Sequence, residues 1–293
     1  MGGGWQGGGW QGGGWQGGGW QGGGWQGGGW QGGGGVATFA MRADKPFADF
    51  AVPLNDTARY PDFPKRYWDP DLFALTILPE FFTLPKTNPA DIYPFAWQNI
   101  TLLPPALITQ NDIDRMLILA VTERPEALGE IIQQDQNLQL SWLQLLMMDA
   151  STHPCTFLLM KLAARVGETM MMVLKRQFDR PRPSQVSPNL FPPVAVPGHG
   201  SYPAGHALIG RLTSICLDEV VPKRTAALME LARRAGFNRV IAGLHYESDV
   251  NEGFKAADKI LPLLNLCQTY KTVKAELILR NEWVVDPVAG TNQ

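Results

Sequence analysis

The feature that most constrains the fold is a succession of apolar residues at helical spacing, which runs through the chain from residue 106 onward. Asn111 or Asp112 can cap the first of these segments, and Pro125 suits the first turn of the second. The expected helices cover residues 112–122, 125–132, 138–148, 155–176, 204–221, 225–242, 247–265 and 269–281. Few runs alternate apolar and polar residues as strands do, and the connections are short. We therefore expect an all-α protein with a single helical bundle.

The N-terminal part of the chain divides into two segments of different composition. Residues 2–31 are six copies of Gly-Gly-Gly-Trp-Gln. This low-complexity tract, residues 1–35, has too few branched apolar side chains to offset the entropy of ordering it, so it is interpreted as a tag, linker or placeholder. Residues 36–105 are rich in proline and aromatic residues. Because proline interrupts regular elements, they are expected to form an irregular wrap, in one domain with the bundle of residues 106–293.

The charged residues nearly balance, with 25 basic and 27 acidic side chains and a net charge of −2. This balance argues against a nucleic-acid-binding surface. The longest uncharged stretch outside the repeats, residues 183–210, is broken by prolines and glycines, so we expect a soluble protein without a membrane span. The three cysteines lack the spacing of a metal site or of a disulfide framework. The sequence leaves open whether the chain forms a homo-oligomer.

Three short motifs contain the residues suited to catalysis. In the first, Lys175 is followed after six residues by Arg182 and Pro183. A guanidinium and an ammonium group can bind one oxyanion together, although cations at a helix C-terminus also complement the helix dipole. The second motif, residues 198–206, reads Gly-His-Gly-Ser-Tyr-Pro-Ala-Gly-His and opens a helix. Its free backbone N–H groups predict an anion site, with Gly205 allowing close approach and His206 in the first turn.

The third motif runs from residue 238 to 249 and contains Arg239, His245 and Asp249. If the segment after Gly243 is helical, His245 and Asp249 lie four residues apart on one face. A carboxylate at that place can accept a hydrogen bond from one ring nitrogen and leave the other as a nucleophile. An ordinary surface pair has the same spacing, so the motif alone does not decide between the two.

Taken together, the three spacings resemble the signature of the type 2 phosphatidic acid phosphatase family. That superfamily also contains the bacterial non-specific acid phosphatases and the vanadium-dependent haloperoxidases. The resemblance covers about residues 175–249, and it implies that the helical bundle is of the phosphatidic acid phosphatase/haloperoxidase type.

The resemblance implies metal-independent hydrolysis of small-molecule phosphate monoesters, through a phosphohistidine and without a cofactor. His245 would attack phosphorus, Asp249 would orient it, and His206 would protonate the leaving oxygen and then activate water. The phosphate oxygens would be held by Lys175, Arg182, Arg239 and the Gly205 amide. His199 is a further candidate for the pocket, whose rim is expected from the aromatic N-terminal segment and residues 184–197.

The chain departs from the family pattern at Ala204, where the family usually has a serine whose hydroxyl would donate to a phosphate oxygen. Ser201 is the candidate that could compensate. If it does not, the protein would be an impaired variant that binds phosphate without efficient turnover. A different alternative is a vanadium-dependent haloperoxidase, in which vanadate would bind through His245 and peroxide would oxidise halide; in a phosphatase, vanadate would act as an inhibitor. The resemblance implies a periplasmic or secreted location, but no signal peptide is visible, so a cytoplasmic location stays open.

Overall fold

The computed structural model describes residue 63 and residues 68–283, so the repeat tract and most of residues 36–67 lie outside the described residues. The described part is helical and contains no strand, which confirms the all-α class. Two short helices come first, α1 (Pro70–Leu75) and α2 (Ile77–Thr83). The longer helices are α3 (Gln110–Thr122), α4 (Arg124–Gln136), α5 (Leu140–Leu146), α6 (Pro154–Phe178), α8 (Gly205–Asp218), α9 (Thr225–Ile241), α10 (Glu247–Leu264) and α11 (Gln268–Arg280). Short turns complete the series: η3 (Ala96–Asn99), α7 (Pro183–Val186) and η4 (Pro188–Leu190).

Local sequence explains where these helices begin. Helix α3 starts one residue after Thr109, whose hydroxyl accepts a hydrogen bond from the Asp112 amide, while the Asp112 carboxylate accepts one from the Thr109 amide. The cap is therefore Thr109, and the predicted caps Asn111 and Asp112 are wrong because they lie inside the first turn. Proline occupies the first turn of both α4 and α6, where no backbone donor is needed.

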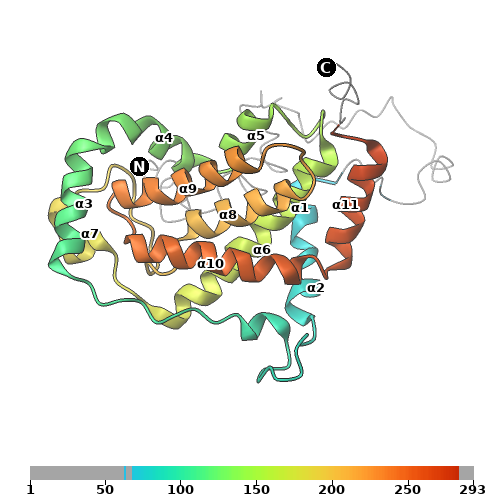
Figure 1. Ribbon diagram of the computed structural model, residues 1–293, viewed down its shortest axis with the longest axis horizontal. Helices are drawn as coiled ribbons and strands as arrows, with labels where there is room; N and C mark the ends of the chain where they lie inside the picture. The colour runs from blue at the N-terminus through green and yellow to red at the C-terminus, as the bar shows by residue number, and fades with distance from the viewer. Residues whose placement is uncertain (1–62, 64–67, 284–293) are drawn as a thin grey trace, which may run out of the picture.

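Helix α8 lies at the centre of the bundle, between α6, α9 and α10 (Figure 1). Its sequence supplies apolar side chains around most of the helix, because neighbours cover it on several sides. Leu208 and Leu212 are completely buried, and they pack in one cluster with Leu159 of α6 and Ile260 of α10. This packing holds α6, α8 and α10 together, and the predicted motifs lie at the ends of these helices.

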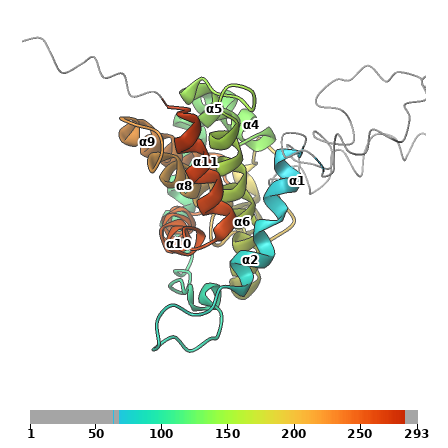
Figure 2. The ribbon, with the colours of Figure 1, turned by 90° about the vertical axis from the view of Figure 1, so that its right-hand side faces the viewer.

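The described part of the N-terminal segment covers one side of α6. Helices α1 and α2 run beside α6, which also contacts α11 (Figure 2). The Trp97 indole donates to the Phe82 carbonyl at 3.0 Å, and the two rings pack edge to face with centroids 5.2 Å apart. Both rings also pack against the core cluster that contains Leu159 and Ile260, so these aromatic residues anchor the segment to the bundle.

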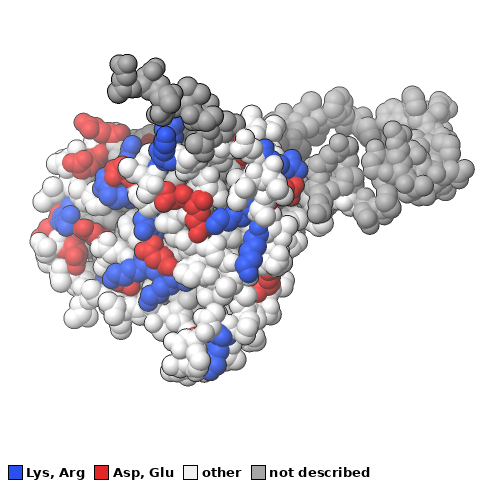
Figure 3. Space-filling model, turned by 45° about the vertical axis from the view of Figure 1, so that its right-hand side comes forward, with Lys and Arg blue, Asp and Glu red and all other residues white. Residues whose placement is uncertain are grey.

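The surface carries charges of both signs. On the face drawn in Figure 3, lysine and arginine side chains alternate with aspartate and glutamate, and neither sign dominates a large patch. No helix in the described part of the chain combines the length and the apolar character needed to cross a bilayer.

Candidate active site

The three motifs meet at one end of the bundle. The first leaves the C-terminus of α6, the second leads into the N-terminus of α8, and the third joins the end of α9 to the start of α10. Their contacts hold these segments together: the Lys175 ammonium donates to the carbonyls of Gly200 at 2.7 Å and Ser201 at 2.9 Å. The Ala204 amide at the start of α8 donates to the backbone carbonyl of Asp249 in α10 at 2.9 Å.

A glycine turn places His245 close to Arg239. Helix α9 ends at Ile241, and Gly243 follows with φ of +78°, a conformation that favours glycine. The Gly243 amide donates to the Val240 carbonyl and the Leu244 amide to the Arg239 carbonyl, which is the Schellman arrangement of a helix C-terminus. The His245 amide also donates to the Arg239 carbonyl, so the cation and the imidazole share one short backbone unit.

The His245 ring lies between a carboxylate and a guanidinium. Its Nδ1 is 3.5 Å from Oδ2 of Asp249, and its Nε2 is 3.4 Å from Nη1 of Arg182. Asp249 is completely buried, and its Oδ2 also accepts from the Tyr246 amide at 3.0 Å. The carboxylate thus faces one ring nitrogen and leaves Nε2 directed toward the cations.

A second arginine holds the Asp249 carboxylate. Arg180 is buried, and its Nη1 donates to Oδ1 of Asp249 and, at 2.9 Å, to the Ser248 hydroxyl. Its Nη2 donates to the Ala106 carbonyl, and the guanidinium stacks on the Tyr246 ring at 4.2 Å from the centroid. Burial raises the pKa of Asp249, whereas Arg180 lowers it. Arg180 therefore favours the ionised form of the carboxylate.

Two further cations line or border the same space. Arg182 is 1 % exposed, and it donates to the carbonyls of His199 at 2.9 Å and Leu244 at 3.0 Å. Arg239 is equally buried, and its Nη2 pairs with Asp135 at the end of α4 at 2.9 Å. Its Nε and Nη1 are buried with no hydrogen-bond partner among the described residues. Unpaired buried donors are costly, so these two nitrogens indicate a place for an anion.

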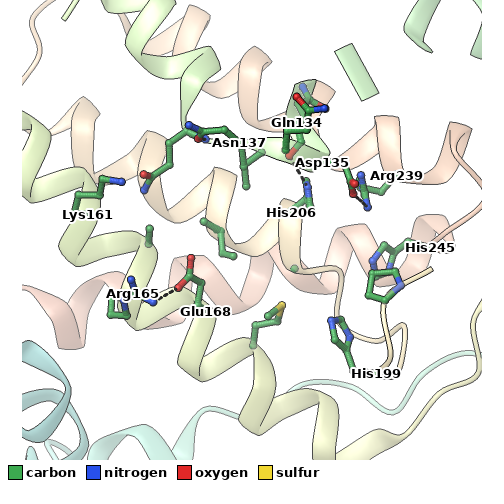
Figure 4. Close-up of a pocket in the computed structure, with 18 of the residues that line it drawn as sticks. Gln134, Asp135, Asn137, Lys161, Arg165, Glu168, His199, His206, Arg239 and His245 are labelled. Carbon is green, nitrogen blue, oxygen red and sulfur yellow. Dashed lines mark hydrogen bonds and ion pairs between the residues drawn. The ribbon is translucent and has the colours of Figure 1, made fainter. Parts of the chain in front are cut away.

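His206 lies in the first turn of α8, beside Gln134 of α4 (Figure 4). Its Nε2 is 3.1 Å from the Gln134 carbonyl. Gly205, the residue before it, packs against α6 so closely that an added Cβ would lie 2.2 Å from the Met171 sulfur. The glycine thereby allows the start of α8, with its free amides, to approach α6.

Burial and the nearby positive charges lower the pKa values of the three imidazoles in the cavity. Burial lowers the pKa of His245 well below its usual 6.5, and Arg182, Lys175 and Arg239 lower it further. Burial and Arg239 lower the pKa of His206 in the same way. Burial, Lys175 and Arg182 lower the pKa of His199 to about 4. A bound anion would offset these cations, so the arrangement favours an anionic ligand.

The pKa values of the buried cations Lys175 and Arg182 are also lowered. Burial lowers the pKa of Lys175, and the neighbouring Arg182 lowers it further. Burial and the neighbouring Arg239 lower the pKa of Arg182 to about 10. Arg182 therefore stays charged at neutral pH, and an anion placed among these groups would be attracted by several of them at once.

One cavity contains most of the predicted residues. Its lining includes Arg182, His199, Gly205, His206, Arg239 and His245 (Figure 4). Lys175 and Asp249 lie directly behind this lining, through their contacts with the carbonyls of residues 200–201 and with His245. The described residues include no group of three or more His, Cys, Asp or Glu side chains placed to hold a metal ion.

Two more of the predicted side chains, those of Ser201 and Ala204, also lie outside the cavity lining. The Ser201 hydroxyl donates to the Pro181 carbonyl at 3.2 Å, so it does not replace a donor at Ala204. Ala204 caps α8 without a side-chain hydrogen bond, and its methyl group is completely buried. For the expected rim, Asp71 and Pro197 line the cavity, but no aromatic residue of the described N-terminal segment does.

Sequence reasoning missed Arg180, Gln134 and Asp135. Arg180 is two residues before Arg182 within the first motif, so its position could have singled it out. Asp135 lies 104 residues from Arg239 in the chain, and no spacing rule connects them.

Residues 154–271 match the family model described as the PAP2 superfamily, and this match spans all three motifs. These residues form a PAP2 domain. It extends from the first residue of α6 into the first turn of α11, so helices α3 to α5 and the N-terminal segment lie outside it. Asp135 and Gln134, which contact Arg239 and His206, therefore come from outside the PAP2 domain.

The chain also resembles curated phosphatases. It is 47% identical over 58 residues to a non-specific acid phosphatase of Salmonella typhimurium, a match that covers 19% of this chain and 22% of that protein. It is 36% identical over 55 residues to an acid phosphatase of Zymomonas mobilis, covering 19% of this chain and 21% of that protein. A match to a non-specific acid phosphatase of Providencia stuartii is weaker, at 25% identity, but covers 60% of this chain and 75% of the relative. The first two matches span about a fifth of the relatives' length.

Proposed function

We propose that the protein hydrolyses phosphate monoesters as an acid phosphatase, without a metal ion and through a phosphohistidine on His245. The observation that carries this proposal is the pair of buried Arg239 nitrogens that have no hydrogen-bond partner in the described part of the chain, in the cavity that also contains His245 and His206. A dianionic phosphoryl group satisfies these donors. The PAP2 match is compatible with either chemistry, and the names of the relatives support phosphatase rather than haloperoxidase chemistry.

In the first step, Nε2 of His245 attacks phosphorus and the ester P–O bond breaks. Asp249 faces the other ring nitrogen, so it stabilises the positive charge that develops on the imidazole. Protonated His206 gives its proton to the leaving alkoxide. Arg182, Arg239, Lys175 and the Gly205 amide neutralise the charge on the three phosphoryl oxygens, which is the main requirement of phosphoryl transfer.

In the second step, water attacks phosphorus and the P–N bond breaks. His206, now neutral, accepts the proton from water, and inorganic phosphate leaves. In the free protein, Nε2 of His206 is close to the Gln134 carbonyl. Substrate must therefore take the place of this contact.

The absence of a metal requirement is directly testable. We expect hydrolysis of phenyl phosphate to persist after dialysis against EDTA, and added Mg²⁺ or Zn²⁺ to change kcat/KM by no more than about twofold. The reason is that protein cations already neutralise the phosphoryl oxygens. A large loss of activity that a divalent metal restores would contradict the proposal.

The lowered histidine pKa values predict an acidic optimum. His245 must be neutral to attack, and its lowered pKa keeps it neutral well into the acid range. His206 must be protonated to act as the acid, and its lowered pKa means that this form is lost as the pH rises. We therefore expect kcat/KM for phenyl phosphate, measured from pH 4 to pH 9, to be bell-shaped with its maximum below 6.5. A maximum above pH 7 would show that the assigned roles are wrong.

Replacing Ala204 by serine should increase activity. Ala204 has extended backbone angles at the N-cap of α8, where a serine hydroxyl can bond an amide of the first turn in the free protein and a phosphate oxygen in the complex. We expect Ala204→Ser to raise kcat/KM for phenyl phosphate by up to about tenfold, the worth of one such hydrogen bond. The free energy of unfolding should rise by about 1 kcal/mol. An unchanged or lower kcat/KM would mean that the missing hydroxyl does not limit the site.

A further inference from the structure

The cavity continues beyond the anion site, along α6. Lys161, Arg165, Glu168 and Met171 line it, and they follow one another at intervals of three or four residues that lead to Lys175. At about 1.5 Å rise per residue, Glu168 lies about 10 Å from Lys175 along the helix axis. Figure 4 shows Lys161, Arg165 and Glu168 gathered at the end of the cavity away from His206, Arg239 and His245.

The charges at this end of the cavity balance one another. Asp71 of α1 is 3.1 Å from the Lys161 ammonium and 3.7 Å from the Arg165 guanidinium, and Arg165 donates to Glu168 at 2.9 Å. Two cations thus face two carboxylates, with side-chain exposure of 8% to 15%. Such a group offers hydrogen-bond donors and acceptors side by side, and its four described side chains carry no excess charge to bind a second anion.

The wall opposite α6 is formed by the connection from α4 to α5. Asn137 and Gln139 line the cavity from this connection, and Gln134 lines it from the last turn of α4. Gln134 is 1% exposed, and its amide nitrogen is buried with no hydrogen-bond partner among the described residues. Its amide oxygen accepts from Asn238 of α9 at 3.0 Å, so the α6 end of the cavity takes its amide groups from Asn137 and Gln139. None of the described residues that line the cavity is Phe, Tyr or Trp, and its three imidazole rings, from His199, His206 and His245, lie at the anion site, so the α6 end offers no ring on which a planar group could stack.

We propose that this α6 end of the cavity, formed by Asp71, Lys161, Arg165 and Glu168 and faced by Asn137 and Gln139, binds the alcohol part of the substrate, and that this alcohol is a small polyol such as a sugar or sugar alcohol. This inference rests on the proposed phosphatase function. Hydroxyl groups both donate and accept hydrogen bonds, which matches the mixture of carboxylates, cations and amides. The balanced charge does not favour a bisphosphate, and the missing aromatic surface does not favour a nucleobase or aryl group.

Two substrates that differ only in their hydroxyl groups test the proposal. Sorbitol 6-phosphate and n-hexyl phosphate have the same six-carbon chain. We expect kcat/KM of the wild-type protein to be at least about tenfold higher for sorbitol 6-phosphate, and Glu168→Gln to reduce this ratio by about tenfold. Lys161→Met, which leaves the Arg165–Glu168 pair in place, should also reduce it. The matched control is Glu230→Gln, which breaks an exposed i,i+3 pair with Arg233 on α9 and should leave the ratio unchanged.

Four results would overturn the proposal. The first is equal kcat/KM for the two substrates in the wild-type protein. The second is an unchanged ratio in both variants. The third is a strong preference for sorbitol 1,6-bisphosphate over sorbitol 6-phosphate, which would assign the same cavity end to a second phosphate. A change in the inhibition constant of inorganic phosphate as large as the change in the ratio would also contradict it, since Glu168 would then act on the anion site.

A binding measurement separates this proposal from the proposed function. Calorimetry on the His245→Ala protein reports affinity without turnover. We expect tighter binding of sorbitol 6-phosphate than of n-hexyl phosphate, and about equal binding once Glu168→Gln is added. If no monoester is hydrolysed but this preference persists, the phosphatase function fails and the polyol site stands. If hydrolysis proceeds without the preference, the polyol site fails alone.

Discussion

Replacing His245 by alanine should abolish turnover, with kcat for phenyl phosphate falling by at least about 10⁴-fold. Among the described residues, the His245 ring is the only imidazole between Asp249 and Arg182, and its Nε2 lies on the side of the cations. Without it the phosphoryl group has no covalent acceptor. Rapid mixing with an alkaline quench should trap a phosphorylated intermediate in the wild-type protein and none in the variant.

The fourth histidine provides the matched control for this experiment. His153 lies at the start of α6, where its ring stacks on Trp283 at 4.4 Å between centroids, and it does not line the cavity. We expect His153→Ala to retain kcat within about twofold. If His245→Ala kept more than a few per cent of wild-type kcat, or if the trapped phosphate remained, His245 would not be the nucleophile.

The second large effect is expected at Arg180, a residue that does not line the cavity. Arg180→Met should lower the free energy of unfolding by about 3–5 kcal/mol at pH 7, because it leaves the buried Asp249 carboxylate without its ion pair. It should also lower kcat, since a protonated or displaced Asp249 no longer stabilises the charged His245 ring. Denaturant unfolding and phenyl phosphate assays measure the two effects.

The pH dependence of the stability loss in Arg180→Met tests whether the unpaired Asp249 carboxylate causes it. Burial raises the pKa of Asp249 and Arg180 opposes that increase, so in Arg180→Met the folded-state pKa lies above the unfolded value of about 3.9. The carboxyl of the variant is then protonated in the folded protein at low pH. The stability deficit should therefore be largest at pH 7 and become smaller toward pH 4.

A surface pair of the same type provides the comparison. Arg211 and Asp258 are 2.9 Å apart with side chains 30% and 49% exposed, so Arg211→Met should cost less than about 1 kcal/mol. Combining Arg180→Met with Asp249→Asn should recover part of the lost stability but none of the lost activity. An Arg180→Met protein as stable as the wild type would contradict the assigned ion pair.

Much of the helical part of this fold follows from sequence. The segment predicted over residues 155–176 is α6, Pro154–Phe178, because its apolar side chains recur at helical spacing and proline marks its start. The sequence also predicted that His245 and Asp249 lie close together, because they are four residues apart at the start of α10. Both features depend on contacts between residues that are close in the sequence, and the residue spacing predicts such contacts.

Other features depend on tertiary contacts that spacing does not report. The Asp135 partner of Arg239 comes from the end of α4, and only the packing of α4 against α9 brings the two together. The direction of the Ser201 hydroxyl follows from the neighbouring Pro181 carbonyl, so its place in the sequence beside Ala204 was a poor guide. The role of Arg180 required knowing that Asp249 is completely buried.

The backbone hydrogen bond from Ala204 to Asp249 has a consequence for how such a protein can diversify. It joins the two helix starts that present His206 and His245, so the spacing between the proposed acid and nucleophile is set by main-chain atoms, whatever the side chains nearby. The facing wall of Asn137 to Gln139 belongs to the short connection between α4 and α5, outside the PAP2 domain. Substitutions on that wall can therefore change the substrate preference while the spacing between His206 and His245 stays the same.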